Sequence, residues 1–191
     1  MKLKFRFTLK FTETKLKGCF ILEPKIIGDE RGSFMESFNE KTFAEGVGQQ
    51  VHFVQDNQSF STKGVLRGLH YQTGAHAQAK LVRVLNGEVL DVAVDLRPNS
   101  PTYGQHETAL LTGDNQIQFY IPRGFAHGFL VLSDTATFFY KCDNFYNAAS
   151  EGGILFNDPT LNIDWKSPIE DIIISEKDQQ LPTLENAKKV W

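Results

Sequence analysis

Hydrophobic positions along this chain fall in short runs, separated by glycine, proline, asparagine or aspartate at intervals of roughly 8 to 12 residues. Some runs alternate apolar with polar residues. Others contain several consecutive apolar residues, such as "KLVRVLNGEVLDVAVDL" at 80–96. Short strands that are spaced by turn residues in this way are typical of an antiparallel β-sandwich or barrel. The pattern therefore predicts an all-β protein.

Local turn and cap signals refine this prediction. Asn86-Gly87 lies between two apolar runs, and this dipeptide is the strongest short-range signal for a β-hairpin. We therefore expect the strands on either side of it to pair with each other. Asn39 is a candidate N-cap for a helix over 40–47, and the segments 167–180 and 184–191 favour short C-terminal turns or helices.

The N-terminal segment needs separate attention because it is both basic and apolar. Residues 2–11 alternate strictly between apolar and polar side chains, which is typical of a strand and not of an export signal. No stretch of about 18 apolar residues occurs, so no membrane-spanning helix is expected. We expect residues 1–191 to form a single domain, with residues 1–10 as an additional strand-like arm.

Composition narrows the classes of partner. The net charge is -3, from 20 Lys and Arg against 23 Asp and Glu, so no general field attracts nucleic acid or an anionic membrane. An anionic ligand would therefore need a local cluster of basic residues. Two cysteines, Cys19 and Cys142, fit a pair of buried thiols in a reducing compartment better than a disulfide scaffold. These features predict a cytoplasmic protein.

The run "GVLRGLHYQ" at 64–72 carries the first candidate chemistry. Arg67 and His70 are three residues apart, so they point to opposite faces of a regular strand. Gly68 between them permits a bulge that would bring both side chains to one cavity. Lys80 opens the next apolar run, where a lysine is usually a solvated edge residue.

A second constellation, Pro122, Gly124 and His127, has the P-x-G-x-x-H spacing of the second motif of the cupin superfamily, whose small barrels often hold a metal. In the first cupin motif, His70 fits one histidine position but Gln72 occupies the other. A metal site would lose a ligand there, and imidazole sites need at least three good donors. We therefore expect no metal.

Several longer blocks occur in a fixed order with short spacers, and together they are more specific than any single motif. They are "GDERGSFMESFN", "FVQDNQS", "VLRGLHYQ", "AKLVRVLNGEVLDVAVDLRPNSPTYG", "IPRGFAHGF", "FFYKCDNFYN", "SEGGILFNDPTLNIDW" and "ISEKD". The set resembles the dTDP-4-dehydrorhamnose 3,5-epimerase family from about Phe11 to the C-terminus.

This resemblance implies a cupin-type jelly-roll barrel that works without metal or cofactor and inverts C3 and C5 of a dTDP-linked 4-keto-6-deoxy sugar. It implies that His70 is the base, Tyr140 the acid and Lys80 an assisting cation, and that Asp178 orients the base. Substrate contacts in the family map to Arg31, Glu36, Gln55, Asn57, Arg67, His127, Glu151 and Lys177.

The resemblance also implies a homodimer whose N-terminal strands are exchanged between subunits, and the arm at residues 2–11 could extend that exchange. Two other classes of function stay open on the sequence. One is a related enzyme that epimerises C3 alone or isomerises the ketone along the ring. The other is a sugar-binding β-sandwich without activity.

Overall fold

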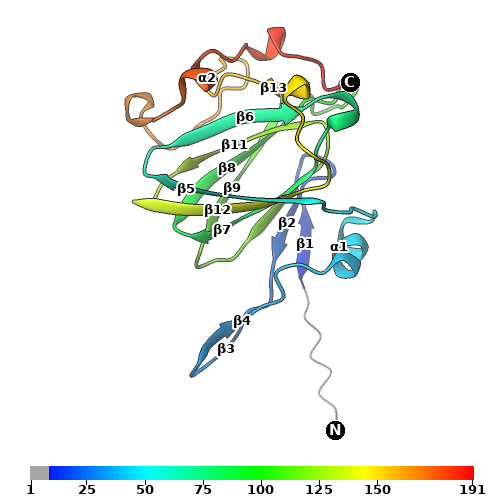
Figure 1. Ribbon diagram of the computed structural model, residues 1–191, viewed down its shortest axis with the longest axis vertical. Helices are drawn as coiled ribbons and strands as arrows, with labels where there is room; N and C mark the ends of the chain where they lie inside the picture. The colour runs from blue at the N-terminus through cyan, green and yellow to red at the C-terminus, as the bar shows by residue number, and fades with distance from the viewer. Residues whose placement is uncertain (1–8) are drawn as a thin grey trace.

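The computed structural model describes residues 9–191, and most of their strands form two antiparallel sheets that face each other (Figure 1). The first sheet has six strands, in the spatial order β1 (Lys10–Glu13), β2 (Phe20–Glu23), β10 (Gln118–Ile121), β7 (Lys80–Asn86), β12 (Thr135–Cys142) and β5 (Gln55–Thr62). The second has five, in the order β13 (Glu151–Gly153), β6 (Leu66–Gln72), β11 (Phe125–Val131), β8 (Glu88–Asp95) and β9 (His106–Thr112). The predicted all-β architecture is confirmed.

The main hydrophobic core lies between these sheets. Val82 and Phe138 come from the six-stranded sheet, and Val89 and Phe129 come from the five-stranded sheet. The rings of Phe129 and Phe138 stack across the interior with centroids 4.1 Å apart. Burial of these side chains is the main force that holds the two sheets together.

The outer face of the five-stranded sheet is also covered. In Figure 1 the C-terminal segment, coloured orange to red, lies over β6 and β13. Its buried residues Ile154 and Trp165 pack with Val92 of β8 and Leu130 of β11. Because both faces of β8 and β11 are covered, these strands are buried almost throughout and are mostly apolar instead of alternating.

Helical segments are short, as predicted. Helix α1 (Glu40–Val47) begins at Asn39, whose side chain accepts a hydrogen bond from the backbone N–H of Thr42, and α1 buries Phe43. Near the C-terminus lies α2 (Glu176–Gln179), capped by Ser175. The remaining helical turns are η1 (Gly74–His76), η2 (Ala148–Ser150), η3 (Ile169–Asp171) and η4 (Leu184–Asn186).

The N-terminal part of the chain contains a hairpin that lies outside the sandwich, and its first eight residues lie outside the described part of the chain. A two-stranded hairpin of β3 (Ile27–Asp29) and β4 (Gly32–Phe34) extends away from the body of the molecule in Figure 1. Most of the predicted N-terminal arm, residues 1–8, falls outside the described part of the chain. Its last residue, Lys10, begins β1 and is paired with β2.

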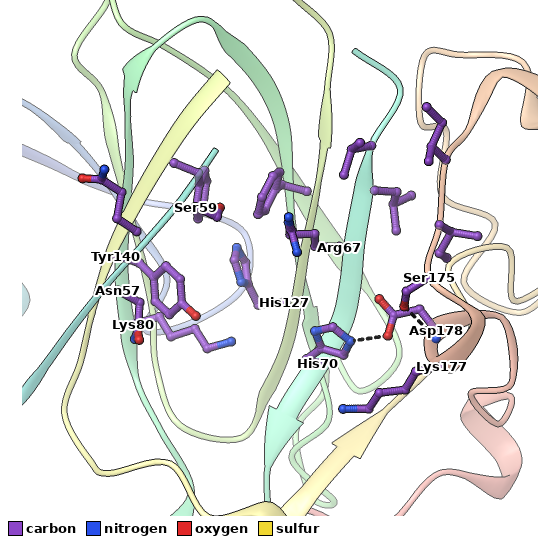
Figure 2. A pocket seen from close by; sticks show the side chains of 17 residues that line it. Asn57, Ser59, Arg67, His70, Lys80, His127, Tyr140, Ser175, Lys177 and Asp178 are labelled. Atoms are coloured by element: carbon purple, nitrogen blue, oxygen red, sulfur yellow. Dashed lines mark hydrogen bonds and ion pairs between the residues drawn. The ribbon is translucent and has the colours of Figure 1, made fainter. Parts of the chain in front are cut away.

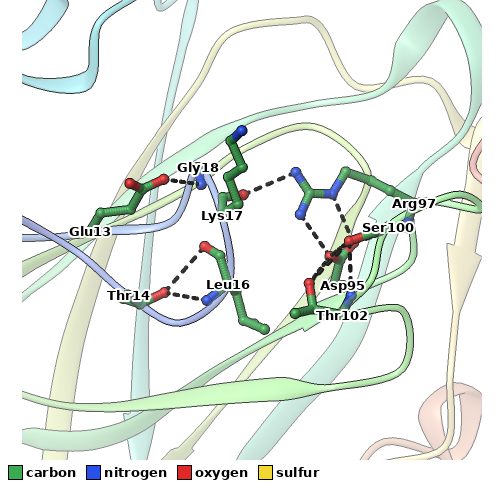
Figure 3. A network of polar contacts seen from close by, with 9 residues as sticks. All are labelled: Glu13, Thr14, Leu16, Lys17, Gly18, Asp95, Arg97, Ser100 and Thr102. Carbon is green, nitrogen blue, oxygen red and sulfur yellow. Dashed lines mark hydrogen bonds and ion pairs between the residues drawn. The ribbon is translucent and has the colours of Figure 1, made fainter.

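A buried carboxylate ties the loop after β8 to the loop before β2 (Figure 3). Asp95 is fully buried and accepts hydrogen bonds from Arg97 Nε at 2.8 Å, Ser100 Oγ at 2.5 Å and Thr102 Oγ1 at 2.7 Å. Arg97 Nη1 in turn donates to the carbonyl of Lys17 at 3.0 Å. These donors compensate for the desolvation of the carboxylate, so the network closes this end of the sandwich.

The hairpin predicted at Asn86-Gly87 is wrong. Strand β7 pairs with β10 and β12, whereas β8 pairs with β9 and β11, so the chain changes sheets at this turn. Gly87 has φ +85°, which suits the dipeptide, but a tight turn does not determine where the next strand goes. The strands separate because apolar residues of both must face the core between the sheets.

This crossing point generates a stability prediction. A Cβ at Gly87 would lie 2.0 Å from the Thr135 carbonyl oxygen, whereas a Cβ at Gly48, with φ +77°, would meet nothing within 4 Å. Both alanine variants incur the left-handed cost of about 1–2 kcal/mol, and Gly87→Ala adds an overlap of about 1–3 kcal/mol. Urea unfolding at one protein concentration should show a clearly larger loss for Gly87→Ala than for Gly48→Ala. Equal losses would contradict the crossing described here.

Candidate active site

A cavity with a volume of about 610 Å³ lies between the two sheets. Figure 2 shows its polar side chains, which come from both sheets and from the segment that contains α2. An adjoining cavity of about 300 Å³ shares Asn57, His70, Lys80 and Tyr140 with the first. These four residues therefore lie where the two cavities meet.

Strand β6 bends as the sequence predicted. Opposite β11, Arg67 aligns with Phe129 and His70 aligns with His127, so three steps along β6 match two along β11. The irregularity occurs at Gly68, which has φ +134° and would place a Cβ 2.5 Å from Gly128 Cα. The bulge turns Arg67 and His70 to the same side, and both line the larger cavity.

His70 forms a close pair with Asp178 from α2. The His70 Nε2 and Asp178 Oδ1 atoms are 2.7 Å apart, and the Asp178 side chain is only 5% exposed. Burial opposes ionisation of Asp178, but its hydrogen bond to His70 and the backbone N–H of Gly68 lower its pKa below the usual value. The carboxylate is thus held ionised beside the imidazole, where it fixes the ring orientation.

Tyr140 and Lys80 extend from neighbouring strands of the six-stranded sheet. Lys80 Nζ lies 5.8 Å from the centre of the Tyr140 ring. Burial raises the pKa of Tyr140, and burial lowers the pKa of Lys80. Both shifts favour the neutral form of the side chain, so the phenol is protonated near neutral pH, and a charge on Lys80 is poorly screened by solvent.

Figure 2 shows that Tyr140 and His70 lie on opposite sides of the cavity, with Lys80 extending between them. His70 belongs to β6 of the five-stranded sheet, and Tyr140 belongs to β12 of the six-stranded sheet. A titratable group from each sheet is thus presented to a shared space. This arrangement suits a reaction in which protons move on both faces of one ligand.

Asp91 is a site residue that the sequence analysis missed. Its Oδ2 atom lies 2.9 Å from Nε2 of His127, which also lines the cavity, and its Oδ1 is buried without a partner among residues 9–191. Asp91 is fully buried within β8, where every other residue except Glu88 is buried. A carboxylate inside the apolar run 88–95 was the signal that could have revealed it.

Other side chains that were predicted to contact the substrate also line the two cavities. Arg67 Nε donates to Ser61 Oγ at 3.2 Å, and Lys177 Nζ lies 2.7 Å from both carboxylate oxygens of Glu151. Lys177 lines the larger cavity, and Glu151 lines the smaller one with Gln55. The ion pair therefore joins the two cavities at their rim.

Arg31 and Glu36 are not brought into the cavities of their own chain. Arg31 lies at the tip of the β3–β4 hairpin, where its Nε bonds to Asp29 at 3.1 Å, and its side chain is 85% exposed. Glu36 accepts a hydrogen bond from Asn39 at 3.3 Å, just before α1. Neither residue lines the cavities that contain His70.

Three further findings concern a metal site, the cysteines and a membrane-spanning helix. Among residues 9–191, no set of three His, Cys, Asp or Glu side chains is placed to hold a metal ion. Cys19 and Cys142 are both free and buried, as predicted. In the same part of the chain, no helix is long and apolar enough to cross a membrane.

The fold and the site together define a cupin-type jelly roll with a cavity between its sheets that is lined by titratable side chains. The family model described as dTDP-4-dehydrorhamnose 3,5-epimerase matches residues 13–186. The chain therefore belongs to the dTDP-4-dehydrorhamnose 3,5-epimerase family, which confirms the predicted resemblance and the cupin-type fold.

Individual relatives agree with this assignment. The chain is 56% identical over 166 residues to dTDP-4-dehydrorhamnose 3,5-epimerase of Shigella flexneri, covering 87% of this chain and 91% of that protein. It is 58% identical to the crystal structure of the same-named enzyme from Elizabethkingia anophelis, with a TM-score of 0.91 and coverage of 96% and 99%. A Legionella pneumophila 3,5-epimerase structure in complex with dTDP-4-keto-L-rhamnose is 51% identical, with a TM-score of 0.90 and 94% of each chain covered.

The buried pair of His127 and Asp91 yields a titration prediction. Burial lowers the pKa of His127, and the charge of Asp91 opposes that shift. By NMR, His127 should therefore titrate below its usual value of about 6.5, and Asp91→Asn should move the midpoint to still lower pH. A midpoint that rises on this substitution would contradict the assigned electrostatics.

Proposed function

We propose that this protein inverts C3 and C5 of dTDP-4-dehydro-6-deoxy-D-glucose to form dTDP-4-dehydro-L-rhamnose, a step in dTDP-L-rhamnose biosynthesis. Its relatives at 56% and 58% identity carry the name of this 3,5-epimerase. The observation that carries the mechanism is the placement of His70 and Tyr140 on opposite sheets around a shared cavity.

Proton removal begins the reaction. A hydrogen on the carbon beside a ketone is a weak acid, so its removal near pH 7 needs a positioned base. His70 takes this proton. Asp178, 2.7 Å from the imidazole, holds the ring and stabilises the imidazolium that forms.

The electrons of the broken C–H bond move onto the C4 oxygen, which becomes an enolate. Lys80 extends into the cavity between the two proton-transfer groups, and within residues 9–191 its Nζ has no hydrogen-bond partner. Its charge is therefore available to the enolate oxygen. In a desolvated site this charge stabilises the developing anion more than it would in water.

Reprotonation must come from the other face, because a base that returned its own proton would restore the original configuration. Tyr140 is protonated at neutral pH and faces His70 across the cavity. It gives its proton to the enolate carbon, and the C4 ketone re-forms. One ketone activates both C3 and C5, so the same groups serve both carbons if the sugar ring shifts between steps.

The proposed reaction needs no redox cofactor, since one proton leaves and one arrives at each carbon. The diphosphate of the substrate is assigned to cationic side chains at the cavity. Arg67 and Lys177 both line it, and guanidinium groups match phosphate oxygens in charge and geometry.

A homodimer would complete the site. The β3–β4 hairpin carries Arg31 away from its own cavity, and Phe34 on this hairpin is 62% exposed. Phe60, on the outward face of the edge strand β5, is 65% exposed. A second copy that covers this sheet would bury Phe60 and receive the hairpin, so Arg31 and Glu36 would contact substrate in the partner's cavity.

We further propose that the chain works as one domain in the cytoplasm. The buried free thiols of Cys19 and Cys142 support a reducing compartment. Epimerisation at C3 alone, ketone isomerisation and sugar binding without turnover are the alternatives. The experiment below separates each of them from the main proposal.

The reaction is tested by NMR of dTDP-4-dehydro-6-deoxy-D-glucose incubated with the protein in heavy water. The wild type should place deuterium at both C3 and C5 and invert both centres. His70→Asn should slow exchange by about 10²–10⁴-fold, the usual contribution of a general base. His76→Asn, which changes a histidine outside both cavities, should match the wild type.

Other outcomes of this experiment decide between the alternatives. Deuterium and inversion at C3 alone would show a C3 epimerase, and movement of the ketone along the ring would show an isomerase. Binding of the nucleotide sugar without exchange at either carbon would show a binding protein. Each result would overturn the proposed double epimerisation.

Contribution of Arg31 to the partner's cavity predicts complementation between inactive subunits. Arg31→Ala and His70→Asn dimers should each have low activity. After unfolding and refolding together, mixed dimers should contain one intact site, which restores about a quarter of all sites when subunits pair at random. If both parent dimers have low activity, no recovery in verified mixed dimers would show that Arg31 acts in its own chain, and an active Arg31→Ala dimer would show that Arg31 has no role.

A further inference from the structure

Five side chains form a row along the inner face of β5, β12 and β7. In the pairing of β5 with β12, Gln55 lies opposite Cys142 and Asn57 lies opposite Tyr140. In the pairing of β12 with β7, Cys142 lies opposite Lys80. All five residues line the smaller cavity, and three of them, Asn57, Lys80 and Tyr140, also line the larger one.

Hydrogen bonds run through this row in one direction. The backbone N–H of Tyr146 donates to Gln55 Oε1 at 3.2 Å, and Gln55 Nε2 donates to Asn57 Oδ1 at 3.0 Å. Asn57 Nδ2 then donates to Cys142 Sγ at 3.7 Å. The first donor is a backbone N–H, which cannot accept a hydrogen bond, so the atom of Gln55 that faces it must be the amide oxygen. This assignment then fixes the orientation of the Gln55 and Asn57 amides that follow.

This order determines what Asn57 offers to a ligand. Its carbonyl oxygen is used by Gln55, and one of its two N–H groups is used by Cys142. Within residues 9–191, the remaining N–H is the one group of the amide left unused, and Figure 2 places Asn57 beside Lys80 and Tyr140. We call this chain of hydrogen bonds, from the Tyr146 backbone through Gln55 and Asn57 to Cys142, the relay. Without it, the Asn57 amide could present either its oxygen or its nitrogen to the cavity.

We propose that Gln55 and Cys142 are positioning residues that hold the Asn57 amide with an N–H toward the substrate oxygen that Lys80 also faces. This inference rests on the proposed epimerisation, because an enolate oxygen is the group that gains most from a second donor. A misplaced amide would present its carbonyl oxygen to the developing negative charge, which would repel it.

Cys142 suits this position because a thiol is a weak acceptor that tolerates burial. Burial raises the pKa of Cys142 to about 11, so the sulfur remains a neutral thiol near pH 7. A carboxylate at this place would instead form an ion pair with Lys80 and remove its charge from the cavity. The neutral sulfur orients Asn57 and leaves the ammonium free.

Two variants remove the relay without touching Asn57. Gln55→Met keeps an unbranched side chain of similar length but cannot bond to Asn57, and Cys142→Val fills the thiol's space without an acceptor. Each should lower kcat for deuterium exchange by about three- to tenfold with KM changed less than about twofold, because the donor acts mainly in the transition state. Cys19→Val, at a buried thiol outside both cavities, is the matched control and should leave kcat unchanged.

A double-mutant cycle with Asn57→Ala separates positioning from general packing. If Gln55 and Cys142 act through Asn57, their substitutions should have almost no further effect on kcat once the amide is gone. Circular dichroism and sizing of each variant confirm that the fold is kept. Effects that multiply in the Asn57→Ala background would overturn the relay.

The wild-type protein shows whether a negative result contradicts the proposed function or only the relay. If the wild type exchanges no substrate hydrogen with solvent, the proposed function itself is contradicted. If the wild type exchanges normally and both Gln55→Met and Cys142→Val keep the wild-type kcat, only the relay is contradicted. Loss of kcat in both single variants that disappears in the Asn57→Ala background supports it.

Discussion

Inversion at a carbon requires a base and an acid on opposite sides of one ring, and this constraint explains most of the architecture. A β-sandwich meets it because each sheet supplies one wall. His70 comes from β6 of one sheet and Tyr140 from β12 of the other. The stacked rings of Phe129 and Phe138, which also line the cavity, join the two walls beneath it. Packing in the core therefore sets the separation that the chemistry needs.

Electrostatics divides the buried groups of the site into distinct roles. Burial keeps Tyr140 protonated and leaves Lys80 with little solvent around its charge. Asp178 stays ionised because His70 and the Gly68 backbone N–H outweigh the cost of its burial. A phenol, an amine and an imidazole with its carboxylate are thus held together within one cavity, the groups to which we assign the proposed proton transfers.

Much of this arrangement could be predicted from the sequence, and the errors have physical causes. Strand spacing indicated the β-sandwich, and Gly68 indicated the bulge in β6, because these are local properties of the chain. The pairing at Asn86-Gly87 was wrong because a turn signal contains no information on which sheet receives the next strand. Asp91 was missed because its position inside a mostly apolar run was not weighed, and its partner His127 could be identified only from the structure. Arg31 was placed at the site by resemblance, but its hairpin lies away from the cavities of its own chain.

The most direct test of opposite-wall proton transfer is the behaviour of Tyr140→Phe with the keto sugar in heavy water. This variant keeps His70, Asp178 and Lys80 but lacks the phenolic proton. The account predicts that deuterium enters the substrate while its configuration is retained, since only the face of His70 can then exchange. Inversion of the sugar at the wild-type rate by Tyr140→Phe would contradict the account.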